Sequence, residues 1–162
     1  MLRLTWRGRA GSMTDTRVRV NPPGASSPMR FDLPTPSPET QAWWDAAGEG
    51  RFLVKRCRAC QRAHFYPRPF CPHCWSDDVV WEEASGRATV YTWSVVHRND
   101  LPPFHERLPY VVAVVELEEG PKAMTNLVDV DPAAIQAGMP VEVVFRALDD
   151  DQELQVPVFR PA

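Results

Sequence analysis

From residue 79 onward, hydrophobic and polar positions alternate at the two-residue spacing of β-strands. This pattern predicts six strands, over residues 79–83, 86–97, 110–119, 122–129, 141–148 and 153–159. A short helix is expected over 131–138, where Asp131 suits the N-cap, Pro132 the first turn and Gly138 the helix end. From residue 86 the order is therefore three strands, one helix and two strands. This is the layout of the OB-fold, a partly open five-stranded barrel.

Within the predicted strand 86–97, the smaller side chains share one face, which suits a tight barrel interior. That expected inward face consists of Ala88, Val90, Thr92, Ser94 and Val96. Ser94 and His97 lie three residues apart and face opposite ways, so they do not form a nucleophile–base pair. No other Ser, Thr or Cys has an evident base and orienting acid. The sequence therefore argues against a Ser/His/Asp hydrolase.

The N-terminal part of the chain is organised differently. Residues 1–36 lack periodicity and contain several Pro, Gly and Ser residues, which predicts a disordered or extended tail. A helix is expected to begin at Ser37-Pro38-Glu39 and to end at Gly48. It carries Trp43 and Trp44, which either pack against the rest of the protein or form a docking surface for a partner. Adjacent helical positions point about 100° apart, so the two side chains need not share one role.

Four cysteines give the strongest chemical signal in the chain. Cys57, Cys60, Cys71 and Cys74 form two Cys-x-x-Cys pairs separated by ten residues, and short strands are expected over 51–56 and 63–67. This spacing predicts a tetrahedral thiolate site.

A structural Zn²⁺ is expected at this site, because four thiolates leave no open coordination position for catalysis. Iron in the same cage would instead give a rubredoxin-type electron carrier. His64 and His73 lie nearby in sequence, but the four cysteines already fill the coordination shell. Both are therefore expected beside the site or at the surface.

Charge is distributed unevenly along a chain of ordinary globular composition. The 162 residues carry a net charge of −3, yet residues 51–75 contain six cations and no acid, whereas residues 100–162 contain four cations and twelve acids. This split suggests two units, a helix with a zinc ribbon over 37–78 and an OB-fold over 79–162. No apolar run approaches the roughly 18 residues of a membrane span. Clustered cysteines and the lack of a secretory-type apolar segment favour the cytoplasm.

Nucleic-acid binding is the obvious alternative for a zinc ribbon joined to an OB-fold. Such barrels present aromatic and basic side chains on their second and third strands. Here these strands and the turn between them offer one aromatic, Tyr110, and one lysine, Lys122. Their acidic residues are Glu116, Glu118, Glu119 and Asp129. Because this surface would repel phosphates, the sequence argues against a nucleic-acid module.

Several motifs in order make the chain similar to a known family. These are Gln41-Ala42-Trp43-Trp44, Cys57-Arg58-Ala59-Cys60, Pro67 to Cys74, Gly86 to Thr92, Val95-Val96-His97, Leu108 to Ala113, Thr125 to Val128, Gly138 to Val141 and Val156 to Pro161. Over residues 38–162 the chain resembles the two-domain proteins with a rubredoxin-like zinc ribbon and an acyl-CoA-associated OB-fold, formerly a domain of unknown function. The family commonly has Gly where this chain has Gln61 and Trp75, positions where glycine relieves a left-handed backbone.

The resemblance implies a non-catalytic accessory subunit of a thiolase-fold enzyme (a thiolase, acyltransferase or aldolase) in acyl-CoA or lipid and steroid metabolism. It also implies that the chain helps to bind a coenzyme A thioester. The basic ribbon could attract the coenzyme A phosphates through Arg62 and Arg68, with His97, Arg98 and Asn126 as further candidates at the barrel mouth. Alternatively, the arginines are solvated and balance the −2 charge of a zinc–tetrathiolate cluster.

Overall fold

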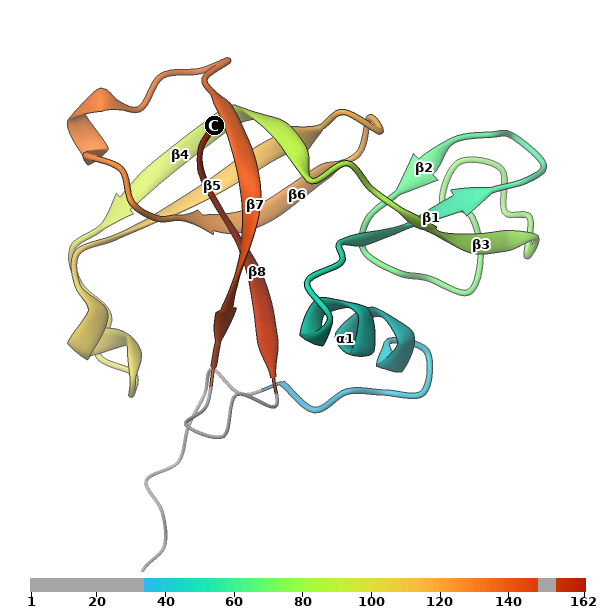
Figure 1. The fold of residues 1–162 in the computed structure, drawn as a ribbon, viewed down its shortest axis with the longest axis horizontal. Helices are drawn as coiled ribbons and strands as arrows, with labels where there is room; N and C mark the ends of the chain where they lie inside the picture. Colours follow the sequence, from blue (N-terminus) through green and yellow to red (C-terminus); the bar gives the residue numbers. More distant parts are fainter. Residues whose placement is uncertain (1–33, 149–153) are drawn as a thin grey trace, which may run out of the picture.

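The computed structural model describes residues 34–148 and 154–162 (Figure 1). The tail expected over 1–36 lies outside the described residues except for its last three. In chain order, the described elements are α1 (Gln41–Gly48), β1 (Leu53–Cys57), β2 (Ala63–His64), β3 (Val79–Glu83), β4 (Arg87–Val96), the 3₁₀ turn η1 (Phe104–Arg107), β5 (Tyr110–Leu117), β6 (Lys122–Leu127), the 3₁₀ turn η2 (Pro132–Ala134), β7 (Pro140–Ala147) and β8 (Gln155–Pro161). No described helix is long and apolar enough to cross a membrane.

A three-stranded antiparallel sheet in the order β2-β1-β3 forms the ribbon. Strand β3 pairs with β1 from Leu53 opposite Glu83 to Cys57 opposite Val79. The guanidinium of Arg56 in β1 forms an ion pair with the Glu82 carboxylate in β3. The ribbon sheet thus includes residues 79–83, which lie beyond the boundary expected between the ribbon and the OB-fold at 78/79.

The remaining strands close into a five-stranded barrel in the order β4-β5-β6-β8-β7, with β7 pairing back onto β4 (Figure 1). The predicted mainly β fold, with an OB-fold barrel after a helix and a four-cysteine ribbon, is confirmed. The barrel is joined least extensively between β6 and β8, which share a single parallel bridge, Leu127 opposite Phe159.

The helix expected over 131–138 is reduced to the single 3₁₀ turn η2. Its predicted cap is present, since the Asp131 carboxylate accepts the backbone N–H of Ala133 at 2.9 Å. The turn ends because Ile135 adopts an extended backbone and is buried in the barrel core, 4% exposed. Burial of an apolar side chain here outweighs continuation of a short, marginal helix.

A β-bulge at Tyr91 corrects the inward face expected for the first barrel strand. Val90 lies opposite Val115 and Thr92 opposite Val114, so Tyr91 is an extra residue in β4. One inserted residue reverses the alternation of side chains. Ala88 and Val90 point inward as predicted, but beyond the bulge Trp93 and Val95 pack against the core while Thr92 and Ser94 are exposed.

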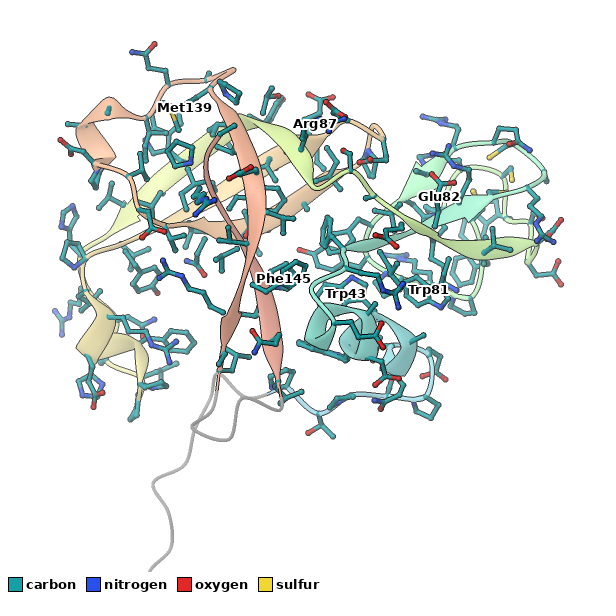
Figure 2. All side chains as sticks on the ribbon, viewed as in Figure 1. Trp43, Trp81, Glu82, Arg87, Met139 and Phe145 are labelled. Atoms are coloured by element: carbon teal, nitrogen blue, oxygen red, sulfur yellow. The ribbon has the colours of Figure 1, made fainter. Side chains whose placement is uncertain are left out.

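The helix, ribbon and barrel share one hydrophobic core, which includes Phe52 and Val54 from the ribbon side and Val90, Val115 and Phe159 from the barrel. Helix α1 packs against β1 and β8. In Figure 2, the Trp43 and Phe145 side chains are seen where the helix meets the barrel, and both pack against this core.

Helix α1 begins later than the sequence suggests. The helix begins at Gln41, because Ser37 to Thr40 form a preceding turn in which the Ser37 carbonyl accepts the N–H groups of Thr40 and Gln41. The buried face of the helix is formed by Ala46 and Ala47, small side chains that allow close approach to the sheet.

Candidate metal centre and adjacent pockets

The four cysteine sulfurs converge at one end of the ribbon. All lie within 4.8 Å of one another, and the pairs Cys57–Cys74 and Cys60–Cys71 are each 3.6 Å apart. Metal–sulfur bonds of about 2.3 Å in a tetrahedron require sulfur separations of about 3.8 Å, so the arrangement fits one Zn²⁺. Cys57 and Cys71 are fully buried, whereas Cys74 is exposed.

Two tight turns carry these sulfurs. The N–H of Gln61 donates to the Cys57 carbonyl and that of Trp75 to the Cys71 carbonyl, each at 2.9 Å. Gln61 and Trp75 have φ angles of 62° and 64°. The left-handed backbone expected at these two positions is therefore confirmed. Trp75 remains 76% exposed and stacks on Phe70, with ring centroids 5.4 Å apart.

The backbone around the first turn stabilises a thiolate. The backbone of Cys60, followed by the Cys74 side chain, outweighs the effect of burial and lowers the pKa of Cys57 to about 7. At Cys74, by contrast, the Ser76 backbone is outweighed by burial and the other three sulfurs, which raise the pKa of that thiol to about 12. The N–H of His73 also donates to the Cys71 sulfur at 3.4 Å. Thiolates are the form that binds zinc. Since four of them saturate a tetrahedral ion, the chemistry available here is structural.

The residues expected to contact coenzyme A lie at separate places. Arg62 and Arg68 are on the ribbon, before and after β2. His97 and Arg98 follow β4 at its end away from the ribbon (Figure 1), and both are exposed. Arg98 pairs with Asp100. Asn126 lies in β6, where its amide donates to the Val111 carbonyl at 3.0 Å. The five side chains thus do not converge on one pocket.

Arg62 lines a hollow of about 540 Å³ between the ribbon and the β5–β6 turn, which we call the ribbon–barrel pocket. Its polar lining comes from Arg56, Gln61, Arg62, His64, His73, Glu119 and Lys122. Burial lowers the pKa of His64, helped by the nearby His73 and only partly offset by the Arg68 backbone. Burial therefore disfavours the protonated form of the His64 ring.

Asn126 lines a second hollow of about 670 Å³, the barrel groove, together with Trp44, Tyr110, Leu127 and Val158. The two tryptophans of α1 take different roles. The Trp43 indole N–H donates to the Leu53 carbonyl at 3.1 Å and its ring contacts Phe52 and Phe65, which fits the packing interpretation. Trp44 is half-buried and faces the groove.

Sequence reasoning missed His64 and Glu119. It placed His64 beside the metal or at the surface, but the side chain is 3% exposed and lines the ribbon–barrel pocket. From sequence alone, Glu119 is only one of the acidic residues that argue against nucleic-acid binding. No local pattern distinguishes either residue, because the pocket depends on the β5–β6 turn approaching a ribbon that lies more than forty residues earlier in the sequence.

Catalytic pairing is absent from the described part of the chain. Within residues 34–148 and 154–162, no Ser, Thr or Cys side chain hydrogen-bonds to a histidine side chain, and the four cysteines form the only metal-type cluster. Ser94 is exposed on β4 and His97 lies beyond the end of the strand.

Two family models match this chain. Residues 44–80 match the ChsH2 rubredoxin-like zinc ribbon domain, and residues 81–146 match the ChsH2 C-terminal OB-fold domain. A DUF35 domain-containing scaffold protein of Methanocaldococcus jannaschii is 40% identical over 97 residues, which cover 59% of this chain and 68% of the relative.

A longer relative is the probable enoyl-CoA hydratase alpha subunit of Thermomonospora curvata, 47% identical over 120 residues. The match covers 74% of this chain but only 36% of the relative's length. Among solved structures, one described as Ltp2-ChsH2(DUF35) aldolase is similar at a TM-score of 0.70 and 42% identity, covering 80% of this chain and 98% of that one.

Proposed function

Since the chain belongs to the DUF35 family, which joins a ChsH2-type rubredoxin-like zinc ribbon to an OB-fold, we propose that it is a non-catalytic accessory subunit of an acyl-CoA-processing enzyme. The partner is a thiolase-fold enzyme, that is a thiolase, an acyltransferase or an aldolase. The thiolate site holds a structural zinc, and the need for reduced thiols supports a cytoplasmic assembly.

One observation carries this proposal. The chain covers nearly all of the ChsH2(DUF35) chain, in a structure whose description pairs that chain with Ltp2 and calls the assembly an aldolase. The same architecture is therefore found in an enzyme assembly. The alpha-subunit name of the Thermomonospora curvata relative is a second support, because a subunit implies a partner.

The distribution of chemistry within the chain supports the same role. The described residues include no nucleophile–base pair, while two hollows lined by apolar and cationic side chains remain open to a ligand. A coenzyme A thioester combines phosphates with an apolar acyl chain, which suits a protein that offers basic and apolar surfaces. We therefore propose that the subunit contributes binding surface for acyl-CoA while the partner performs the reaction.

The test is reconstitution of the assembly. The tagged full-length chain is purified from its native host, co-eluting proteins are identified by mass spectrometry, and acyl-CoA turnover is measured for each component and for the mixture. We expect a near-stoichiometric thiolase-fold protein, no turnover by the chain alone, and higher turnover by the mixture than by the enzyme alone.

Two results would overturn the proposal. One is turnover of an acyl-CoA by the isolated chain at a rate that no partner changes. The other is a thiolase-fold protein whose activity and stability are the same with and without an excess of this chain.

A further inference from the structure

The ribbon–barrel pocket is formed by two parts of the chain that are distant in sequence. Ribbon residues near β2 and the second cysteine turn form one wall, and the β5–β6 turn, Glu119 to Lys122, forms the other. In Figure 1 this turn is the part of the barrel that reaches toward the ribbon. The volume of about 540 Å³ falls within the range of small-molecule sites and exceeds what a single phosphate ion would fill.

His64 lines this pocket and has no well-formed hydrogen bond. The side chain is 97% buried, since only 3% of its surface is exposed, and neither ring nitrogen has a hydrogen bond of good geometry among the described residues, although the Arg68 backbone is near enough to raise the pKa of the ring. A neutral imidazole carries one donor and one acceptor. Buried polar groups in native proteins are almost always satisfied, so an unpaired ring beside an open hollow points to a bound molecule.

Glu119 presents a second unpaired atom in the same hollow. Its Oε1 accepts the N–H of Ser85 at 2.7 Å, but the buried Oε2 has no partner among the described residues. A carboxylate oxygen needs a donor, such as a hydroxyl or an amino group. The pocket therefore offers a hydrogen-bond acceptor as well as donors. A bare phosphate ion does not need that acceptor.

Two cations from opposite walls remain available for an anion. Arg56 is committed to Glu82 and to the Gln61 carbonyl. Arg62, by contrast, forms no ion pair or side-chain hydrogen bond within the described residues. Lys122 lies 4.0 Å from a Glu116 oxygen and over the ring of Tyr91, a loose and exposed arrangement. Arg and Lys side chains that face one hollow suit a phosphate group.

We infer that the ribbon–barrel pocket binds a phosphorylated nucleoside, with Arg62 and Lys122 on the phosphate and His64 and Glu119 on hydroxyl or amino groups. This inference rests on the proposed function in one respect: the nucleoside is taken to be the phosphoadenosine end of acyl-CoA. It assigns recognition of that end to four residues of this chain, and the barrel-mouth residues His97 and Arg98 take no part.

The test is calorimetric titration of the zinc-loaded full-length chain with 3′,5′-ADP, coenzyme A, adenosine and inorganic phosphate. We expect 3′,5′-ADP and coenzyme A to bind with similar affinity and the other two probes to bind much more weakly. Arg62→Ala and Lys122→Ala should each raise the dissociation constant at least about tenfold, since each removes a charge-assisted contact. Both side chains are exposed, so neither variant endangers folding.

Arg160→Ala is the matched control, because this arginine pairs with Glu142 on the barrel and does not line the pocket. We expect less than a twofold change. Equal affinity for inorganic phosphate and 3′,5′-ADP would overturn the nucleoside assignment, and either no binding or binding that Arg62→Ala and Lys122→Ala leave unchanged would overturn the site.

These outcomes are separable from failure of the proposed function. Nucleotide binding by a chain that has no enzyme partner would refute the accessory role and leave the pocket standing. An active assembly whose chain binds no nucleotide would refute the pocket alone.

Discussion

The ring of Phe52, which precedes β1 of the ribbon, meets the ring of Phe159 in β8 of the barrel edge-on, with centroids 6.0 Å apart and planes at 84°. The two side chains are 3% and 1% exposed. Because both belong to a single hydrophobic cluster, ribbon and barrel stabilise each other. The pocket between them therefore has walls held in a fixed relation.

Phe52→Ala should destabilise the whole chain. Loss of a buried aromatic side chain costs about 3–5 kcal/mol, because contacts are lost and a cavity remains. The measurement is denaturant unfolding at a fixed excess of zinc, followed by fluorescence and circular dichroism. Leu101→Ala is the control, since Leu101 is 49% exposed and its removal should change the free energy of unfolding by less than about 0.5 kcal/mol. Separate ribbon and barrel transitions in the wild type would contradict a shared core.

Gly86, which immediately precedes β4, should not tolerate a side chain. Its φ is +74°, and a Cβ at this position would lie 2.6 Å from Cγ1 of Val143. Gly86→Ala should therefore lower the free energy of unfolding by about 2 kcal/mol or more, through backbone strain and a steric clash.

Gly48→Ala provides the matched comparison for that substitution. Gly48 ends α1, and a Cβ there would meet nothing within 4 Å. Because alanine favours the helix over glycine, this variant should be neutral or more stable by up to about 1 kcal/mol. Thermal unfolding of both variants checks the pair, and similar losses of stability would refute the steric argument.

The parts of the structure that follow from local pattern could be predicted, and those that depend on tertiary pairing could not. The metal centre follows from the spacing of Cys57 to Cys74, because two short turns place four sulfurs without help from the rest of the chain. The bulge at Tyr91 has no local signature, since an extra residue is visible only when β4 is aligned with β5. The pairing of β3 with the ribbon and the burial of His64 likewise depend on distant segments.

Gln61 should be replaceable by glycine with a gain in stability. Its φ of 62° costs an L-residue about 1–2 kcal/mol, part of which glycine forfeits through the greater entropy of its unfolded chain, about 0.4–1 kcal/mol. Gln61→Gly should therefore raise the free energy of unfolding by about 0–1.6 kcal/mol. Gln61→Val should lower it by about 1 kcal/mol, because a β-branched residue fits this backbone poorly. Thermal unfolding of the zinc-loaded proteins should rank glycine, glutamine and valine in that order.

Metal analysis of the purified chain should find one zinc per molecule and no visible colour. Iron in the same cage would give an intense thiolate absorption and would support the electron-carrier alternative.

Cys71→Ser should lower metal affinity by orders of magnitude, because it removes a buried ligand, and should destabilise the ribbon with it. His73→Ala tests whether the four sulfurs alone hold the ion. The His73 side chain is exposed in the ribbon–barrel pocket, so this substitution should leave the zinc content unchanged. A loss of zinc in His73→Ala would show that the histidine contributes to the site and that the four thiolates do not complete the coordination shell.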